Sequence, residues 1–206
     1  MGKNNLTAII MATMVEAKPF VTGMFLDHII KKPFSIFKKK KMLLVICGIG
    51  KANAAMATTY CHTKFKPDKI FNIGAAGALT RSKKQGRIYH INKIIEHDRL
   101  NLKTGTPFIH KPSIIHGFKY AILSTSDKAV ISIDERKKVS ECGGELVDME
   151  GASIVQTCKK FNTPAYLFKY VSDTPEHVKK LNIIDNIREL RQTSFTFFMD
   201  HFKSNS

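Results

Sequence analysis

The chain has 206 residues, 43% of them hydrophobic, which suits one domain with a single core and excludes disorder along its whole length. No apolar stretch reaches the roughly 20 residues that a membrane-spanning helix needs, so we expect no membrane contact. The 33 Lys and Arg residues exceed the 17 Asp and Glu residues by 16, which raises nucleic acid as a partner. Only six of these cations are Arg, the residue that reads bases and phosphates in bidentate pairs, so we do not expect nucleic-acid binding to be the main function.

Strand-like and helix-like segments alternate along the chain, a pattern typical of an α/β domain. The apolar run TAIIMATM predicts a buried strand at 7–14, and apolar residues near helical spacing predict a helix at 16–31. The further predicted strands are residues 33–37, 42–48, 68–73, 87–95, 119–125, 145–148 and 164–172. The further predicted helices are residues 51–65, 134–141, 149–161 and 181–202, with an irregular excursion at 97–118. No repeat or linker interrupts this order, so we expect residues 1–206 to form a single domain.

Two segments admit alternative interpretations. Lys3 and the apolar residues 6–15 imitate a signal peptide, but no convincing small-x-small cleavage site follows and Glu16 comes directly after, which favours a buried strand. The four lysines at 38–41 could form a phosphate-binding patch, but their place between two short predicted strands favours the solvated tip of a hairpin.

The cysteine and histidine patterns argue against disulfides and metal. Cys47, Cys61 and Cys158 lie in apolar contexts and no CxxC pair occurs, so we expect buried, reduced thiols in a cytoplasmic protein. The eight His residues show neither HxxxH nor HExxH spacing, so we expect no metal site.

Three acidic residues, Glu16, Glu150 and Asp173, come at the ends of predicted strands, as do the glycine turns at 48–50 and 74–78. Because ligands in open α/β sheets bind beyond the carboxyl ends of the strands, these groups are predicted to meet at one edge and form an active site. Taken singly, each acid could be an ordinary helix-start residue and each glycine turn a tight connection. The coincidence of all five favours the active site.

Four motifs resemble a known family: Cys47-Gly-Ile-Gly-Lys-Ala-Asn-Ala-Ala55, Asn72-Ile-Gly-Ala-Ala-Gly-Ala78, Val147-Asp-Met-Glu-Gly-Ala-Ser153 and Val171-Ser-Asp173. They resemble the signatures of the nucleoside phosphorylase/hydrolase superfamily and, within it, those of the 5′-methylthioadenosine/S-adenosylhomocysteine nucleosidases. The resemblance extends from Glu16 to the last predicted strand, which is most of the chain. It implies a three-layer α/β/α sandwich around a twisted mixed sheet, acting as a homodimer without metal or cofactor.

The resemblance also implies hydrolysis of the N-glycosidic bond of an adenine nucleoside, with roles for individual residues. Asp173 matches the acid that protonates or hydrogen-bonds purine N7, and an Asp that closes an apolar strand is partly desolvated, which favours its protonated form. Glu16 matches the carboxylate that activates the attacking water, and Glu150 the carboxylate that binds the ribose hydroxyls. The further substrate contacts implied are Met149, Ala75, Gly77, Val130 and Ser172.

Two other functions remain as alternatives. A purine nucleoside phosphorylase of the same superfamily needs a phosphate pocket, usually with Arg and Ser near the small-residue turn, and residues 72–76 contain neither. A basic, non-catalytic binding protein that reuses the fold predicts a clustered Arg/Lys face, whereas the lysines of this chain are dispersed.

The sequence also departs from the nucleosidase pattern at several positions. Ala75 stands where Ser is frequent, Thr13 where a Met near the sugar is usual, and Lys169 where Arg is common. The aromatic residue that stacks on the base has no clear counterpart in residues 126–131. These departures concern the substrate pocket, so the preferred base and 5′ substituent are left open.

Overall fold

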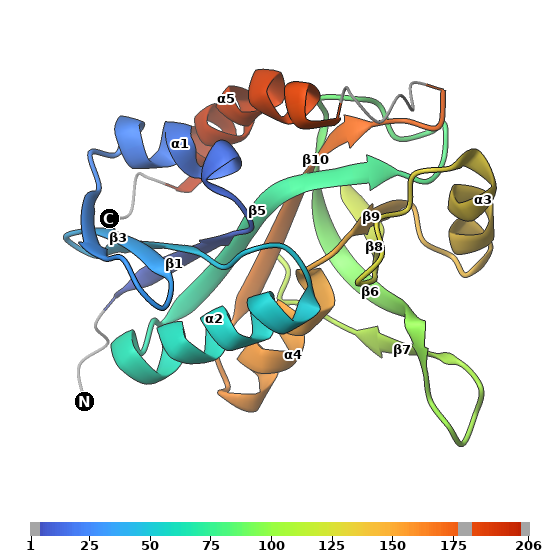
Figure 1. The fold of residues 1–206 in the computed structure, drawn as a ribbon, viewed down its shortest axis with the longest axis horizontal. Coiled ribbons are helices and arrows are strands. Elements are labelled where there is room, and N and C mark those ends of the chain that lie inside the picture. Colours follow the sequence, from blue (N-terminus) through green and yellow to red (C-terminus); the bar gives the residue numbers. More distant parts are fainter. Residues whose placement is uncertain (1–4, 177–182, 203–206) are drawn as a thin grey trace.

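The computed structural model describes residues 5–176 and 183–202, which form a mixed ten-stranded sheet between two helical layers (Figure 1). The strands are β1 (Thr7–Met11), β2 (Asp27–Ile30), β3 (Ser35–Lys39), β4 (Met42–Ile46), β5 (Lys69–Ala78), β6 (Ile88–Leu100), β7 (Pro107–His110), β8 (Tyr120–Thr125), β9 (Leu146–Asp148) and β10 (Ala165–Asp173). The helices are α1 (Met14–Gly23), α2 (Lys51–Phe65), α3 (Ile133–Glu141), α4 (Gly151–Lys160) and α5 (Ile183–Phe202). Helices α1 and α5 cover one face of the sheet, α2 and α4 cover the other, and α3 lies apart at one end. The predicted three-layer α/β/α class is confirmed.

Strand β5 is the hub of the sheet. It pairs in parallel with β1 and β10 and antiparallel with β9, while β4 pairs in parallel with the other edge of β1. Strand β10 also pairs with β6, and the sequence β6–β8–β9 leads back to β5, so this half of the sheet closes on itself. The carboxyl ends of β1, β4, β5 and β10 therefore lie at one edge, beside β9.

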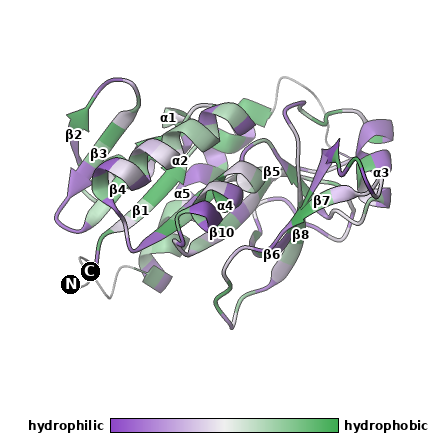
Figure 2. Cartoon of the chain, turned by 90° about the horizontal axis from the view of Figure 1, so that it is seen from below, coloured by the Kyte–Doolittle hydropathy of each residue, from purple (hydrophilic) through white to green (hydrophobic). Residues whose placement is uncertain are grey.

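The core has one apolar cluster on each face of the sheet because successive strand side chains alternate. On β5, Ile70 belongs to the cluster under α2 and α4, whereas Phe71 belongs to the cluster under α1 and α5. Phe71 meets Phe198 of α5 edge-on, with ring centroids 5.6 Å apart. Figure 2 shows hydrophobic residues along the central strands, whereas α3 is largely hydrophilic.

Helix α1 begins with a reciprocal cap and contains a proline. The Thr13 side chain accepts a hydrogen bond from the backbone of Glu16, whose carboxylate accepts one from the Thr13 backbone. Pro19 lies inside the helix and has no N–H for the carbonyl of Val15, four residues earlier. Arg191 of α5 donates to that carbonyl over 3.1 Å, so the second helix supplies the missing hydrogen bond.

The helix predicted at 16–31 was wrong in its second half. Helix α1 ends at Gly23, where a side chain would lie only 2.2 Å from the ring of Phe195, and Phe25 then takes a left-handed φ of 53°. Residues 27–30 form edge strand β2 instead. The excursion at 97–118 is partly regular, because β6 runs to Leu100 and pairs with β7.

Several other predictions about the turns, helices and cysteines are confirmed. The lysines at 38–41 lie at the turn between β3 and β4, with Lys39, Lys40 and Lys41 exposed. Helix α2 has the predicted bounds, and α5 occupies the described part of the helix predicted at 181–202, whose first two residues lie outside the described ranges. Three of the four free cysteines are buried, as expected. In the described part of the chain, no helix is long and apolar enough to cross a membrane.

Candidate active site

A cavity of about 260 Å³ opens at the shared edge of β1, β5, β9 and β10. This volume is slightly below the usual range for small-molecule sites, about 300–1,000 Å³. The cavity is lined by all eight site residues predicted from the sequence: Glu16, Ala75, Gly77, Val130, Met149, Glu150, Ser172 and Asp173. Three carboxylates that are far apart in the chain thus face one space.

Glu16 is buried in the first turn of α1 and fixed from two sides. Its Oε1 accepts a hydrogen bond of 2.9 Å from the backbone N–H of Ala75, and its Oε2 accepts hydrogen bonds from the backbone and hydroxyl of Thr13. Ala75 therefore contributes its backbone, which explains why a residue without a hydroxyl can stand there. A carboxylate has about four acceptor positions, so Glu16 retains capacity for one further donor such as water.

Glu150 precedes α4 and crosses the cavity edge to the glycine turn. Its Oε1 accepts a hydrogen bond of 2.9 Å from the N–H of Gly50, a residue with a φ of 100° that favours glycine. Burial and the nearby charge of Asp148 raise the pKa of Glu150 to about 7, although Lys169 and the Gly50 N–H oppose this shift. Glu150 therefore changes charge close to neutral pH.

A buried ion pair lies behind these carboxylates. The ammonium group of Lys169 is 2.8 Å from Asp148, which also accepts hydrogen bonds from Thr125 and from the backbone of Gly151. Burial disfavours the charged form of Lys169, but the carboxylates, Asp148 first, raise its pKa on balance, so it stays a cation. The lysine at this position thus supplies a positive charge beneath Glu150, as an arginine would, but without a planar fork.

Asp173 ends β10 and has a partner that the sequence analysis missed. Its Oδ2 pairs with the guanidinium of Arg136 from α3, and its Oδ1 accepts a hydrogen bond of 2.5 Å from Ser172. Asp173 is buried, as expected of an acid that closes an apolar strand, but it has a cation beside it that the strand pattern does not indicate. Ser172 contacts Asp173, and the absence of a side chain at Gly77 leaves room for the ion pair.

The remaining walls of the cavity are mostly aliphatic. Val130 and Ile131 come from the loop before α3, Met149 lies beside Glu150, and α5 adds side chains that the sequence analysis did not place here, Ile183, Ile184 and Ile187. Among the described lining residues none is aromatic, which agrees with the lack of a stacking residue in the sequence at 126–131.

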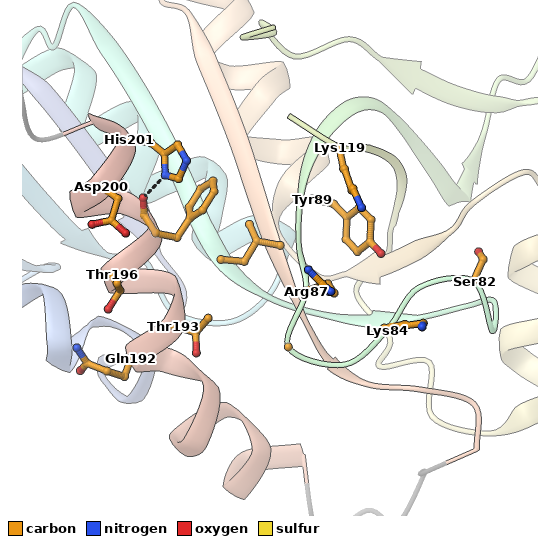
Figure 3. A pocket seen from close by; sticks show the side chains of 13 residues that line it. Ser82, Lys84, Arg87, Tyr89, Lys119, Gln192, Thr193, Thr196, Asp200 and His201 are labelled. Carbon is orange, nitrogen blue, oxygen red and sulfur yellow. Dashed lines mark hydrogen bonds between the residues drawn. The ribbon is translucent and has the colours of Figure 1, made fainter. Parts of the chain in front are cut away.

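A larger hollow of about 730 Å³ lies between residues 82–89 and α5 (Figure 3). Its wall carries Lys84, Arg87 and Lys119 on one side and Asp200 and His201 of α5 on the other. It contains none of the predicted site residues and no group of carboxylates. We therefore place the candidate active site at the smaller cavity. No cluster of His, Cys, Asp and Glu suited to a metal ion occurs in the described ranges, 5–176 and 183–202.

Comparison with known proteins decides the family. The model of the phosphorylase superfamily matches residues 8–203. The chain belongs to the phosphorylase superfamily. One similar member is the 5′-methylthioadenosine/S-adenosylhomocysteine nucleosidase of Staphylococcus aureus (strain JH9), which is 29% identical over 194 residues, covering 83% of this chain and 79% of that protein.

Solved structures of superfamily members share the fold. The 5′-methylthioadenosine/S-adenosylhomocysteine nucleosidase of Helicobacter pylori, solved with butyl-thio-DADMe-Immucillin-A, has a TM-score of 0.84 and 19% identity, covering 95% of this chain and 97% of that one. Futalosine hydrolase of Helicobacter pylori strain 26695 has a TM-score of 0.83 and 20% identity, covering 94% and 95%. At these identities the likeness concerns the fold.

The raised pKa of Glu150 predicts how this superfamily member responds to pH. A carboxyl group whose pKa is about 7 in the folded protein and near 4.5 when unfolded contributes stability below pH 4.5 that is lost as pH rises through 7. At pH 8 the penalty is on the order of 3 kcal/mol, so Glu150→Gln should raise the melting temperature at pH 8 by about 6–12 °C and change it little at pH 4.5.

Thermal unfolding followed by circular dichroism at both pH values tests this expectation. Glu189→Gln, which neutralises an exposed glutamate of α5, is the matched control and should show no such pH-dependent gain. A Glu150→Gln protein that melts at or below the wild-type temperature at pH 8 would contradict a raised pKa for Glu150.

Proposed function

We propose that this protein hydrolyses the N-glycosidic bond of an adenine nucleoside, 5′-methylthioadenosine, S-adenosylhomocysteine or a related nucleoside, and releases adenine. The observation that carries the proposal is the convergence of Glu16, Glu150 and Asp173 on one cavity. The nucleosidases named among its relatives support the substrate class.

The reaction assigns each carboxylate a separate task. Glu16 takes a proton from water while the water oxygen forms a bond to C1′ of the ribose. The bond from C1′ to N9 breaks, and its electron pair passes to the base. Asp173, in its protonated form, gives its proton to N7, so that adenine leaves as a neutral molecule and the proton that Asp173 loses balances the one that Glu16 takes up. Glu150 binds the ribose hydroxyls, and its negative charge stabilises the cationic sugar of the transition state.

The charges of the cavity favour water over phosphate as the nucleophile. In the part of the chain that the structure describes, both cations in the cavity wall already have acidic partners: Arg136 pairs with Asp173, and Lys128 with Glu135. Phosphate would enter a space lined by four carboxylates, those of Glu16, Asp148, Glu150 and Asp173, without a spare cation in its described wall to balance its charge.

Adenine release measured with and without phosphate tests the proposal. We expect the purified protein to release adenine from 5′-methylthioadenosine in phosphate-free buffer, at a rate that added phosphate leaves unchanged. Release that depends on phosphate, with the sugar recovered as its 1-phosphate, would assign the protein to the phosphorylases instead.

We also propose that the protein acts as a cytoplasmic homodimer. Its free, mostly buried thiols support the location. Exposed apolar side chains support self-association: Ile49 lines the cavity and is 55% exposed, and Leu102, beyond the end of β6, is fully exposed. Lys51 bonds Asp98 over 2.8 Å, which holds the start of α2, close to Ile49 in the chain, against β6.

A further inference from the structure

Arg136 is a charged side chain buried within the described part of the protein, with only 2% of its surface exposed. It belongs neither to the three predicted carboxylates nor to the pair of Lys169 and Asp148. It lies in the first turn of α3 and reaches back to three different segments. Its Nε donates to the carbonyl of Ile131 over 3.3 Å, its Nη1 donates to the carbonyl of Ala78 over 2.7 Å, and its Nη2 pairs with Asp173. The guanidinium thus connects α3, the end of β5 and the end of β10.

Packing of α3 does not explain why an arginine stands here. A small apolar cluster of Leu79, Val130, Val139 and Val147 already holds α3 and its preceding loop against the sheet. Burying a guanidinium is unfavourable unless its hydrogen bonds and charge are satisfied, and an apolar side chain of similar length would avoid that penalty. Because Arg136 forms its buried ion pair with Asp173, the predicted acid, we look for its role in the candidate active site.

The surroundings of the pair fix the direction of the Asp173 carboxylate. Arg136 holds Oδ2, Ser172 holds Oδ1, and Gly77 lets both charged groups approach the backbone of β5, since a Cβ there would lie 3.2 Å from Oδ2 and 3.4 Å from the guanidinium. A carboxylate has about four acceptor positions, so both oxygens keep a free position that can carry the proton given to N7.

We propose that Arg136 is a positioning residue for the nucleosidase reaction: it acts through Asp173, holding this carboxylate in one orientation toward the purine base. The inference rests on the proposed function. A bound purine would meet a carboxylate that cannot rotate, because a planar guanidinium and a hydroxyl hold its two oxygens. A displacement of about 1 Å at a reacting group can reduce a rate by about 10²-fold, which sets the size of the effect.

A double-mutant cycle separates this role from a purely structural one. Wild type, Arg136→Met, Asp173→Asn and the double variant are compared for kcat and KM on 5′-methylthioadenosine, with Arg136→Lys as the conservative variant. We expect Arg136→Met to lower kcat by about 10²-fold with a smaller change in KM, and Arg136→Lys to recover at least tenfold of that loss. In the Asp173→Asn background the Met substitution should change kcat by less than about threefold. Arg188→Met, which breaks the exposed pair with Asp185, is the control and should leave turnover unchanged.

Thermal unfolding of the same set is a second readout that does not need turnover. Because the double variant leaves no unpaired buried charge, we expect it to melt at or above the temperature of Asp173→Asn. Two results would overturn the inference and leave the proposed function intact, provided that the wild type is active. One is that Arg136→Met lowers kcat by the same factor in the wild-type and Asp173→Asn backgrounds. The other is that Arg136→Met and Arg136→Lys have the same kcat. A wild type that releases no adenine would remove the proposed function, and this inference with it.

Discussion

Asp173→Asn is expected to lower the single-turnover rate of adenine release by about 10²–10⁴-fold, the usual contribution of a positioned acid. The amide has nearly the same shape, and its oxygen can still accept from Arg136 while its NH₂ faces Ser172. It cannot exchange a proton with N7. Rapid mixing of excess enzyme with 5′-methylthioadenosine, followed by quantification of adenine, measures the rate of the chemical step.

The Asp173→Asn variant should also be less stable than the wild type. The measurement must therefore separate this loss of stability from the loss of rate in the chemical step. Arg136 would be left as a buried cation without a counterion, and loss of one partner of such a pair costs about 3–5 kcal/mol. Rates are therefore normalised to the folded fraction from circular dichroism. Asp185→Asn, which breaks an exposed pair with Arg188, provides the control and should change neither rate nor stability appreciably. A folded Asp173→Asn protein with more than about a tenth of wild-type turnover would remove the acid assignment.

The sequence predicts those parts of the fold whose signals are local. Helix α2 has its predicted bounds because Gly48 and Gly50, with φ of 87° and 100°, make the turn that separates it from β4. The second half of the helix predicted at 16–31 was wrong because apolar residues after Gly23 occur at spacings that suit a helix as well as a strand. Pairing of β2 with β3, which is a tertiary contact, decides between them.

The candidate site also has a part that the sequence predicts, the three acids, and a part that it does not, the cations paired with acids there. The meeting of Glu16, Glu150 and Asp173 follows from where the strands end and from their shared direction, both of which a sequence pattern can indicate. The cations that face these acids do not follow. Arg136 is 37 residues from Asp173 in the chain, on a helix whose position depends on tertiary packing, and it resembles any exposed helical arginine in sequence. In the sequence Lys169 stands out only as a departure from a family pattern, and no local signal pairs it with Asp148.

Glu16→Gln and Glu150→Gln should separate catalysis from binding. Glu16→Gln removes the base that activates water, so we expect kcat to fall by about 10²–10⁴-fold while a ribose-bearing transition-state mimic binds almost as before. Glu150→Gln replaces charged hydrogen bonds to the ribose hydroxyls by neutral ones. It should lower kcat/KM and weaken the mimic by about 10–100-fold.

The structure adds a control for Glu16. Gln has one oxygen and one NH₂ group, so it cannot accept from both Ala75 and Thr13, and the cap of α1 will weaken by about 1 kcal/mol. Rates of Glu16→Gln are therefore normalised to the folded fraction from circular dichroism, which separates the loss of the cap from the loss of the base.

The pH dependence of binding gives Glu150 a signature of its own. The ionised form accepts hydrogen bonds from both ribose hydroxyls, whereas the protonated form has lost charge and acceptor capacity. Because the pKa of Glu150 is about 7, affinity of the wild type for the mimic should rise between pH 6 and pH 8, and Glu150→Gln should abolish the rise. The same rise should persist in Glu16→Gln. If Glu16→Gln turns over normally, Glu16 only caps its helix, and if the rise survives in Glu150→Gln, another group binds the ribose.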